Sequence, residues 1–463
     1  NIVIIGAGEV GFNLAKALSK EDHSITVIDI NSEKCKRITN TIDAHVIHGD
    51  GCSQRILQNI EINKTDYLLS LTRIDEVNLV ASKLAKEMGA KKVICRLRNT
   101  EYSHKNTVIE PDQFGINHIV FPEKAACNEI KKLIKPGHMI CVKSTVPPGT
   151  TRKIIYKILG SKKNIDLAFT PERFSEGTAI KEFRSLPIVV GGVTDRATNN
   201  VANFWNKFLN TKIIKVVNCE TAEYVKIATN AWIDLNIGFA NDLARLAGKL
   251  NSKIDILDVS KSSNSLKKGE RYVNILLPSI GVGGSCLTKD PWFIYSMGKK
   301  KKIDLFTIKA GRKSNNIMPY FSSEIIYNYL NKKKLNYKKV KISILGFSFK
   351  SDSGDIRHTP VIPLINDLKK KGIKNIWIYD PLVTEKDQIK INLKINSSSK
   401  NVINNSDCII ICAAHKNIKN LSINYLASNS KKGALILDGR RYFERNEINK
   451  IKKKGLKYIG IGR

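Results

Sequence analysis

The sequence lacks any apolar run long enough to cross a bilayer, although 42% of its 463 residues are hydrophobic and 26% are charged. A membrane helix needs about 20 consecutive apolar residues, so we expect no direct membrane insertion. The nine cysteines also lack paired C-x-x-C spacing and a Cys/His cluster. This pattern argues against a disulfide framework and a structural metal, and it predicts a reduced cytoplasmic protein without bound metal.

Acidic residues are scarce, with 42 Asp and Glu against 77 Lys and Arg and a net charge of +35. Such a balance can indicate a nucleic-acid partner. Here the lysines lie in short runs spread along the chain, and no basic motif interleaved with aromatic residues accompanies them. We therefore expect no nucleic-acid partner, although a basic surface would attract a phosphate-bearing substrate.

A glycine-rich turn at residues 6–11, G-A-G-E-V-G, follows a strand-like apolar run and opens a helix, and the next strand ends near Asp29. This order is the dinucleotide-binding fingerprint in its confirming context. Gly6 allows the turn, Gly8 the close approach of a pyrophosphate, and Gly11 the packing of helix on strand. Asp29 can accept hydrogen bonds from ribose hydroxyls, and its charge favours NAD over NADP.

A second glycine-rich turn delivers Cys286 and, four residues later, Asp290; its glycines are Gly281, Gly283 and Gly284. The glycines allow backbone N–H groups to approach a bound ligand closely, and a thiol held there can act as a nucleophile. The alternative is a tight turn before a helix, with Asp290 as its N-cap and a proline at the first helical position.

Further alternation of strands and helices follows the first fingerprint, with strands expected near residues 44–47, 67–71, 93–97 and 118–121. Residues 1 to about 133 resemble the nucleotide-binding domain of Trk-type potassium-uptake regulators, on the motifs at residues 6–11, 27–29, 48–50, 71–78 and 120–123. The resemblance implies binding of NAD(H) or another adenine nucleotide, and an ion-transport partner. The implied cofactor contacts are Gly6, Gly8, Glu9, Val10, Gly11, Asp29, Asp50 and Thr72.

A different pattern begins near residue 135. The segments 144–151, 171–177, 186–192, 222–232 and 281–291 resemble, in order, the nucleotide-sugar dehydrogenases, which oxidise a UDP-sugar to its uronic acid with NAD. The resemblance runs to Arg463. It implies two hydride transfers from the C6 alcohol, with a cysteine that retains the intermediate aldehyde.

The resemblance implies a catalytic set of Thr145, Glu172, Lys226, Asn230, Cys286 and Asp290. In it, Lys226 and Asn230 stabilise an oxyanion, Asp290 is the base, Cys286 forms a thiohemiacetal and then a thioester, and Glu172 with Thr145 directs the hydrolytic water. By themselves these residues allow other interpretations. Lys226 and Asn230, one helical turn apart, can be a solvated surface pair, Glu172 can pair with Arg173, and Thr145 can be a turn hydroxyl.

Substrate contacts are implied by the same resemblance. Arg271 resembles an arginine that, in some relatives, extends across a dimer interface to hold the nucleotide sugar. The other implied contacts are the glycines Gly281, Gly283 and Gly284, and Lys350 and Arg357 as phosphate and sugar contacts. Arg271 can instead be a surface arginine. His358 stands where relatives usually carry an acid. The predicted helix at 222–250 resembles the family's dimer interface, so a homodimer is expected.

We therefore predict an α/β chain with a doubly wound Rossmann-type N-terminal unit, a central long-helix dimerisation region and a second Rossmann-like C-terminal domain. The expected domains are residues 1–133, the remainder of the NAD-binding domain at 134–212, a helical catalytic domain at 213–330 and a UDP-binding domain at 331–463. Each of the two resemblances predicts its own fifth and sixth strand of the nucleotide-binding sheet, and the two pairs cannot occupy the same positions in one sheet. Either the first unit is a separate closed domain, or the strands merge into a hybrid sheet.

Three hypotheses follow. The first is an active dehydrogenase for a UDP-N-acetylhexosamine such as UDP-N-acetylmannosamine, with UDP-glucose as the alternative substrate. In the second, a nucleotide-sensing potassium-transport module carries an inactive dehydrogenase. The third is a chance join of two genes.

Overall fold

The structure is a computed structural model that describes residues 1–99, 102, 111–159, 164–174, 178–209, 211–250, 253–385, 387–388, 393–396 and 398–463. The chain forms two compact units. The first contains residues 1–138 and 155–164, and the second contains residues 139–154 and 165–463. The last three residues of the predicted motif at 171–177 lie outside the described residues.

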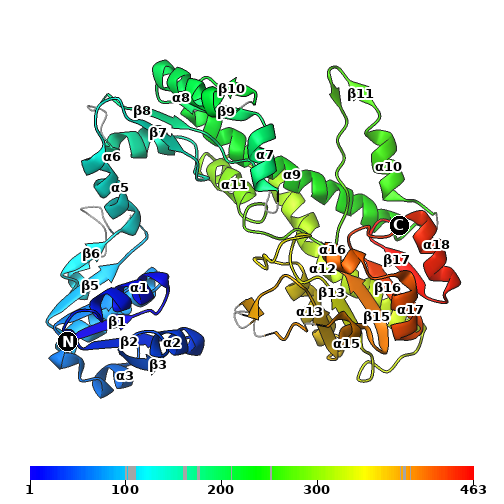
Figure 1. The fold of residues 1–463 in the computed structure, drawn as a ribbon, viewed down its shortest axis with the longest axis horizontal. Helices are drawn as coiled ribbons and strands as arrows, with labels where there is room; N and C mark the ends of the chain where they lie inside the picture. Colours follow the sequence, from blue (N-terminus) through cyan, green and yellow to red (C-terminus); the bar gives the residue numbers. More distant parts are fainter. Residues whose placement is uncertain are drawn as a thin grey trace. The chain divides into compact units, whose positions relative to one another are not determined.

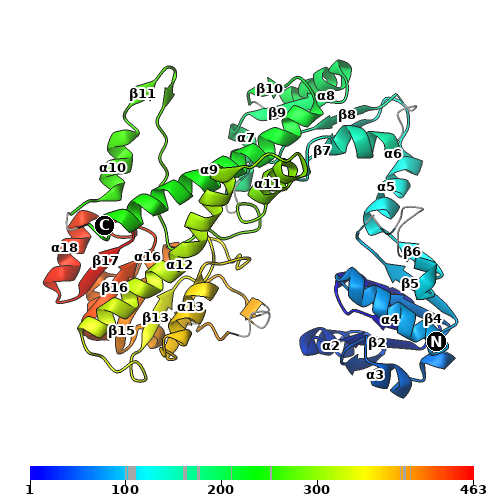
Figure 2. The same ribbon diagram turned by 180° about the vertical axis from the view of Figure 1, so that it is seen from behind.

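The first unit is built on a parallel sheet (Figures 1 and 2). Its strands are β1 (Ile2–Ile5), β2 (Ile25–Asp29), β3 (His45–His48), β4 (Tyr67–Ser70), β5 (Lys92–Arg96) and β6 (His118–Val120), and its helices are α1 (Glu9–Leu18), α2 (Ser32–Thr39), α3 (Gln54–Asn59), α4 (Asp75–Glu87), α5 (Pro122–Leu133) and α6 (Lys157–Leu159). The strand order is β3-β2-β1-β4-β5-β6. This is the order of a dinucleotide-binding sheet, and it confirms the predicted doubly wound unit.

Helices cover both faces of this sheet because successive strand residues point to opposite sides. Ile4 packs with Phe12 of α1 in the core on one face, whereas Ile5 packs with Leu79 of α4 in the core on the other. The central strand β1 is accordingly apolar and buried at every position, as expected of a parallel strand covered on both faces.

The second unit begins with a four-stranded sheet. Its strands are β7 (Met139–Val142), β8 (Asp166–Phe169), β9 (Ile188–Gly192) and β10 (Ile213–Lys215), in the order β10-β9-β8-β7, with helices α7 (Ala179–Ser185) and α8 (Asp195–Phe208). Strands β7 and β8 are parallel, whereas β8 and β9 are antiparallel. The choice between a separate closed domain and a hybrid sheet stays a prediction.

Two long helices lie side by side in the second unit, as Figures 1 and 2 show. They are α9 (Cys219–Ala247) and α12 (Phe306–Lys332), accompanied by α10 (Ile256–Ser263), α11 (Asp290–Lys300) and a hairpin of β11 (Lys267–Lys268) and β12 (Arg271–Tyr272). Gly238 of α9 and Gly311 of α12 meet at the crossing, where a Cβ on Gly238 would lie 2.9 Å from the Gly311 carbonyl oxygen. The absence of both side chains allows this close approach. The predicted helical centre is confirmed.

A second parallel sheet ends the chain, in the order β14-β13-β15-β16-β17. Its elements are β13 (Ile342–Leu345), α13 (Val361–Lys370), β14 (Ile376–Tyr379), α15 (Ser399–Ile403), β15 (Ser406–Ile411), α16 (Lys416–Lys419), α17 (Ile423–Asn429), β16 (Ser430–Asp438), α18 (Arg445–Lys453) and β17 (Lys457–Gly460). Met318 of α12 and Leu364 of α13 belong to the core on one face, and Leu426 and Ile451 to the core on the other. This sheet confirms the predicted Rossmann-like C-terminal domain, while the finer boundaries near 133, 212 and 330 stay predictions.

No helix among the described residues is long and apolar enough to span a membrane.

Candidate active site

Cys286 lies on the turn that leads into α11, and its thiol is exposed. The turn is closed by the Cys286 carbonyl, which accepts hydrogen bonds from the backbone N–H of Lys289 at 3.1 Å and of Asp290 at 2.8 Å. The carbonyl is thereby held while the thiol stays accessible. This is the placement that a nucleophile requires.

Asp290 is buried, with 1% of its surface exposed. Its Oδ2 accepts a hydrogen bond from Nδ2 of Asn230 at 2.6 Å, and its Oδ1 lies 3.8 Å from Nζ of Lys289. Oδ1 has no hydrogen-bond partner among the described residues. The N-cap of α11 is Lys289, with no side-chain capping bond. The interpretation of Asp290 as an N-cap is therefore wrong, and one buried carboxylate oxygen is available to accept a proton.

Lys226 is also buried, with 9% of its surface exposed, and its Nζ donates a hydrogen bond to the backbone carbonyl of Glu172. Asn230, one turn later on α9, holds Asp290. The interpretation of Lys226 and Asn230 as a solvated surface pair is therefore wrong, because both side chains donate hydrogen bonds to other segments of the protein.

Glu172 follows strand β8, and its side chain is exposed. Arg173, its expected alternative partner, instead donates to the carbonyl of Pro187. Thr145 is partly buried in the segment after β7. The catalytic roles of both residues stay predictions.

The glycines of the cysteine turn face the protein itself. A Cβ on Gly283 would lie 2.5 Å from Cβ of Phe349, and one on Gly281 would lie 2.7 Å from Cβ of Pro360. The Gly284 N–H donates to the carbonyl of Arg357 at 2.9 Å. The sequence predicted that these glycines allow a ligand to approach the backbone closely. At these atoms the segment 349–360 packs against the cysteine turn instead.

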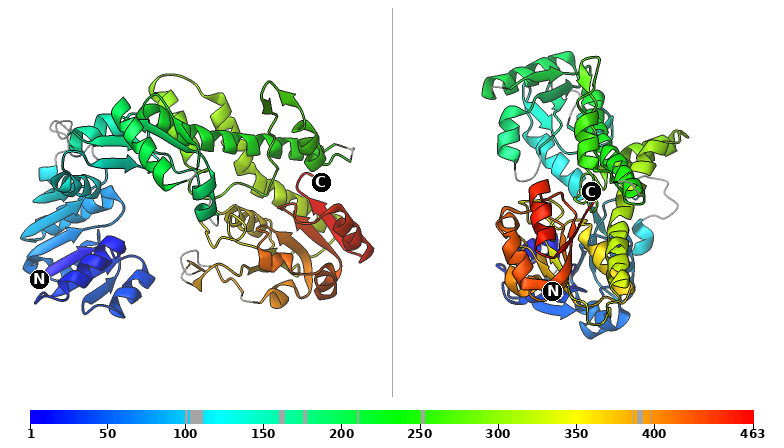
Figure 3. Two further views of the ribbon diagram at one scale, coloured as in Figure 1. Left: turned by 45° about the horizontal axis from the view of Figure 1, so that its top comes forward. Right: turned by 90° about the vertical axis from the view of Figure 1, so that its right-hand side faces the viewer.

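The predicted phosphate and sugar contacts lie on that segment. Arg357 forms a short-range ion pair with Asp355, whose Oδ1 and Oδ2 each lie 2.9 Å from Arg357 Nε. Lys350 is partly buried, and His358 is exposed with a left-handed backbone φ of 50°. Arg271 lies apart from these residues on the exposed β11–β12 hairpin, which Figures 1 and 3 show projecting beyond α10.

Sequence reasoning missed Glu223. Its fully buried carboxylate accepts hydrogen bonds from the backbone N–H of Gly149 at 2.5 Å and of Thr151 at 2.7 Å, and from the Thr151 hydroxyl at 2.6 Å. The bonds fasten the Pro-Pro-Gly-Thr segment to the first turns of α9. The signal was a glutamate three residues before Lys226, on the same helical face as the predicted catalytic residues Lys226 and Asn230.

Asp380 was also missed. It follows β14, and its Oδ2 accepts hydrogen bonds from Ser348 N at 2.9 Å and His415 Nε2 at 3.0 Å. Burial would raise the pKa of Asp380, but the bond and charge of His415 together with backbone donors lower it. Asp29 occupies the corresponding place in the first unit, where its Oδ2 accepts from Ala7 N at 2.7 Å. In both Rossmann-type sheets an acid at the end of the second strand, Asp29 within β2 and Asp380 just after β14, thus binds the turn that follows the first strand.

Arg441 was not predicted either. It follows β16, and its Nη1 is buried without a hydrogen-bond partner in the described part of the chain. Burial, together with the neighbouring Arg440 and Arg463, lowers the pKa of Arg441 to about 10, against the opposing charge of Asp438. An unpaired guanidinium N–H in a basic cluster fits an anionic ligand.

The predicted cofactor residues lie together in the first unit, around a cavity of about 440 Å³. Its lining includes Gly6, Gly8, Glu9, Val10, Asp29, Asp50 and Thr72. A Cβ on Gly8 would meet nothing within 4 Å, whereas one on Gly11 would lie 1.9 Å from the Gly6 carbonyl oxygen. Gly8 therefore leaves open space for a ligand, while the absence of a side chain at Gly11 allows α1 to lie close to the turn after β1.

Two arginines that sequence reasoning missed, Arg73 and Arg96, line the same cavity. Nε of Arg96 is buried and has no hydrogen-bond partner among the residues that the structure describes. Asp29 is already bonded to Ala7 N and, at 2.8 Å, to Asn31 N, and Lys34 lies 3.6 Å away. Open space at Gly8 and an unpaired arginine N–H fit a phosphorylated nucleotide such as NAD.

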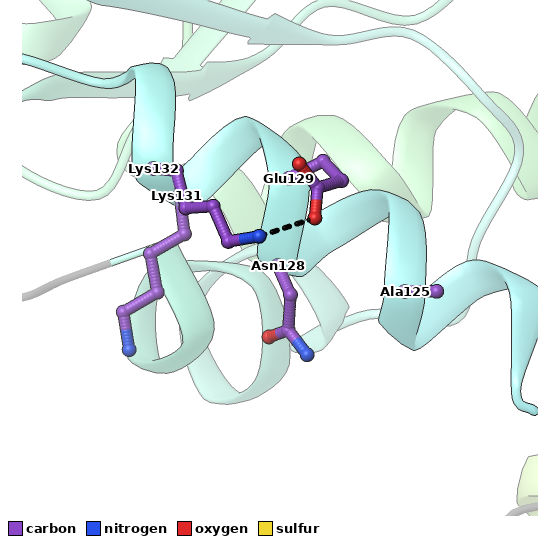
Figure 4. A pocket seen from close by; sticks show the side chains of 5 residues that line it. All are labelled: Ala125, Asn128, Glu129, Lys131 and Lys132. Carbon is purple, nitrogen blue, oxygen red and sulfur yellow. Dashed lines mark hydrogen bonds and ion pairs between the residues drawn. The ribbon is translucent and has the colours of Figure 1, made fainter.

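Another hollow, of about 630 Å³, lies along α5 and is lined by Ala125, Asn128, Glu129, Lys131 and Lys132 (Figure 4). Lys132 pairs with Glu129 at 2.6 Å. All five residues belong to one helix, and none is a predicted site residue. In the described part of the chain, no cluster of His, Cys, Asp and Glu could hold a metal ion.

Family models match the chain in four segments. A TrkA-N domain matches residues 2–122. Three models of the UDP-glucose/GDP-mannose dehydrogenase family follow: its NAD binding domain at residues 120–209, its central domain at 220–317 and its UDP binding domain at 343–445.

Known relatives match along the full chain. A UDP-N-acetyl-D-mannosamine dehydrogenase of Methanococcus vannielii is 31% identical over 464 residues, covering 100% of this chain and 97% of the relative. The chain belongs to the UDP-glucose/GDP-mannose dehydrogenase family. Another member, the UDP-N-acetyl-D-mannosamine dehydrogenase of Pyrococcus horikoshii, is 26% identical and covers 100% of this chain and 99% of the relative. Both alignments include the residues that the TrkA-N model matches, so family membership extends to the first unit.

Solved structures show the same fold. A UDP-D-ManNAc dehydrogenase from Pyrococcus horikoshii has a TM-score of 0.63 at 24% identity, covering 100% of this chain and 99% of that chain. An NDP-N-acetyl-D-galactosaminuronic acid dehydrogenase from Methanosarcina mazei has a TM-score of 0.64 at 23% identity, covering 100% and 95%. The family assignment confirms both predicted resemblances and makes the chain a nucleotide-sugar dehydrogenase.

Proposed function

We propose that this chain oxidises the C6 alcohol of a UDP-N-acetylhexosamine, such as UDP-N-acetylmannosamine, to the uronate with NAD. The observation that carries the proposal is the grouping, within one unit, of an exposed Cys286 thiol, a buried Asp290 whose Oδ1 accepts no hydrogen bond from the described residues, and Lys226 and Asn230 on the adjoining helix. The names of the relatives favour the N-acetylmannosamine substrate. UDP-glucose is the alternative.

The residues divide the chemistry as follows. Asp290, directly or through water, accepts the hydroxyl proton on Oδ1, the oxygen that Asn230 leaves unbonded. The Lys226 ammonium stabilises the developing oxyanion. The Cys286 sulfur bonds to the aldehyde carbon to give a thiohemiacetal, and after the second oxidation it holds a thioester. Glu172, with Thr145, orients and deprotonates the water that replaces the sulfur, which releases carboxylate and thiol.

When bound, NAD would accept one hydride in each of the two oxidations, so two NAD would be consumed per sugar. We assign its binding to the cavity of the first unit, where Gly6, Gly8 and Gly11 shape the turn and Asp29 and Asp50 line the ribose side. Glu9, Val10 and Thr72 complete the lining. The open space at Gly8 and the unpaired N–H of Arg96 support this assignment.

The UDP group would be held by the C-terminal domain. Lys350 and Arg357 are the predicted contacts, and the unpaired N–H of Arg441 adds a third cation. Guanidinium groups suit the diphosphate because they donate two parallel hydrogen bonds. The glycines Gly281, Gly283 and Gly284 support this site indirectly, since they allow the 349–360 segment to lie against the cysteine turn.

We further propose a homodimer formed through α9. Three large apolar side chains of this helix are exposed at a spacing of seven residues: Trp232, Phe239 and Leu246. Heptad spacing of apolar residues is typical of helix–helix contacts. Arg271, on its projecting hairpin, would then contact the substrate of the partner copy.

The test is NADH formation by the purified chain with NAD and a panel of UDP-sugars, beside Cys286→Ala. Two NADH per sugar, abolished in the variant, would support the proposal, and the panel would identify the sugar. No NADH with any sugar, from protein that still binds NAD, would contradict it.

One observation favours a second function. The first unit contains all the predicted cofactor residues, whereas all the predicted catalytic residues lie in the second unit. A nucleotide-sensing regulator of an ion-transport partner, joined to an inactive dehydrogenase, would have this division. It predicts nucleotide binding without NADH formation in the same assay. The cytoplasmic location stays a prediction from the cysteine pattern.

A further inference from the structure

We propose that His415 is a positioning residue for the diphosphate of the UDP-sugar, because its ring joins two loops at the carboxyl ends of the C-terminal sheet. His415 is buried, with 1% of its surface exposed. It is the N-cap residue of α16, yet its side chain makes no capping bond to that helix. Both ring nitrogens instead contact other segments of the domain.

The two ring nitrogens have different roles. Nδ1 of His415 accepts a hydrogen bond from the backbone N–H of Asp352 at 2.9 Å. A backbone N–H can only donate, so in this arrangement the ring carries its proton on Nε2. Nε2 donates to Oδ2 of Asp380 at 3.0 Å, and the same oxygen accepts from the backbone N–H of Phe347 at 2.7 Å. We call residues 346–352 the β13 loop; Asp380 thus holds its beginning and His415 its end.

The position of these loops in the sheet indicates a ligand site. The strand order is β14-β13-β15-β16-β17, so the chain passes from β13 to one side and then returns to the other side at β15. In open parallel sheets, ligands bind outside the carboxyl ends of the strands at such a switch point. The β13 loop follows one of these strands and residues 412–415 follow the other. A Cβ on Gly346 would overlap the Ala413 carbonyl oxygen, so the two loops touch at their base.

Lys350, the predicted phosphate contact, lies within the β13 loop between two tethered residues. The Phe349 carbonyl before it accepts a hydrogen bond from Nη2 of Arg440 at 2.9 Å. Asp352 after it bonds to His415 and has a left-handed backbone φ of 55°, a conformation that surrounding contacts must hold. A loop that is already ordered binds its ligand without the cost of ordering. Loss of the His415 bond should therefore lower the fraction of chains that are ready to bind the diphosphate.

This inference rests on the proposed function, in which the diphosphate contacts the β13 loop, and its test separates the two ring nitrogens. His415→Asn places an amide oxygen near the position of Nδ1 and keeps an acceptor for Asp352. His415→Gln places an amide nitrogen near the position of Nε2 and keeps only the donor to Asp380. The measurement is calorimetric titration of the full chain with UDP, which needs no turnover. We expect His415→Gln to raise the Kd for UDP about 10-fold, and His415→Asn to raise it less than about 3-fold.

Two further variants test the same two loops and the rest of the sheet. Ser351→Ala removes the hydroxyl that accepts from the Ala414 N–H at 3.1 Å, a neighbouring bond between the loops, and should raise the Kd about 3-fold. Ser406→Ala is the matched control, since its buried hydroxyl bonds at the amino end of β15, away from both loops. It should lower stability and leave the Kd for UDP unchanged. In NADH formation, His415→Gln should raise KM for the UDP-sugar with little change in kcat.

Unchanged UDP affinity in His415→Gln and Ser351→Ala would overturn this inference alone. So would equal weakening in His415→Asn and His415→Gln, because the bond to Asp352 would then make no difference. Equal weakening in Ser406→Ala would also overturn it, because lost stability would then explain the effect. An unsubstituted chain that does not bind UDP would overturn the proposed substrate and this inference together. UDP binding without NADH formation would contradict only the proposed oxidation, since the UDP titrations of the variants test this inference separately.

Discussion

Nδ2 of Asn230 donates a hydrogen bond to Oδ2 of Asp290 at 2.6 Å, across 60 residues of sequence. The bond joins the middle of α9 to the first residue of α11 and fixes the buried carboxylate that lies four residues after Cys286. A buried carboxylate without its donor keeps the full cost of lost hydration.

Asn230→Ala should therefore reduce the free energy of unfolding by about 1–3 kcal/mol, because it removes the donor to the buried Oδ2 of Asp290. Urea unfolding measures this change. Thr229→Ala is the control, since its hydroxyl donates to the Val225 carbonyl of its own helix and its loss should cost less than about 0.5 kcal/mol. Equal stability of the two variants would contradict the assigned role of the Asn230–Asp290 bond.

The cysteines should differ widely in reactivity. Among the eight cysteines whose surroundings the structure describes, only Cys286 is exposed. Burial raises the pKa of Cys95 to about 11 and that of Cys412 to about 12. Because the thiolate is the reactive form, iodoacetamide at neutral pH should modify Cys286 first, as peptide mass spectrometry would show. Faster labelling of Cys95 or Cys412 would contradict the described burial.

Gly8 and Gly11 should respond oppositely to alanine. A Cβ on Gly8 enters open space in the cofactor cavity, so Gly8→Ala should weaken NAD binding and leave stability unchanged. A Cβ on Gly11 would overlap the Gly6 carbonyl, so Gly11→Ala should lower stability by about 1–3 kcal/mol. Calorimetric titration and thermal unfolding separate the two effects. Unaltered NAD affinity in Gly8→Ala would place the nucleotide elsewhere.

Acid should destabilise the C-terminal domain through Asp380. The pKa of Asp380 is lowered in the folded chain, so its contribution to stability is present above the unfolded value of about 3.9 and is lost as pH falls through the folded value. Asp380→Asn should therefore flatten the dependence of unfolding free energy on pH below about 4. Asp242→Asn, at an exposed pair with Arg245, should leave that dependence as it is. Parallel curves for all three proteins would refute the argument.

The apolar stripe on α9, formed by Trp232, Phe239 and Leu246, should control dimer formation. Phe239, with 50% of its surface exposed, lies at the middle of the stripe. Phe239→Lys should convert a dimer to a monomer in sedimentation analysis, because it places a charge in an apolar contact. Lys253→Glu, beyond the end of α9, should not. A monomeric unsubstituted chain would exclude the proposed dimer.

Much of this architecture could be predicted from the sequence because local patterns determine it. The buried strands and the turn at Gly6 combine local apolar periodicity with fixed glycine spacing. The burial of Lys226 and Asp290 did not follow from local pattern, since a charged residue on a helix is usually solvated. Their catalytic interpretation came from the family resemblance instead.

Other features depend on contacts between distant segments. Glu223 bonds to Thr151 across 72 residues, and the Gly284 N–H is taken by Arg357. No sequence pattern near Glu223 or Gly284 indicates these partners. The sequence also does not determine whether the strands form one hybrid sheet or two separate sheets, because strand propensity does not specify which strand edges pair.

The composition of the first unit from two stretches, residues 1–138 and 155–164, has a consequence for the history of the gene. The polypeptide leaves this unit, returns to it and leaves it again, and the returning stretch supplies α6, which packs on α5. A single recombination crossover near residue 134 would therefore have separated α6 from the helix that it covers. An ancestral exchange of this unit would have needed several breakpoints or later adaptation of the returning stretch.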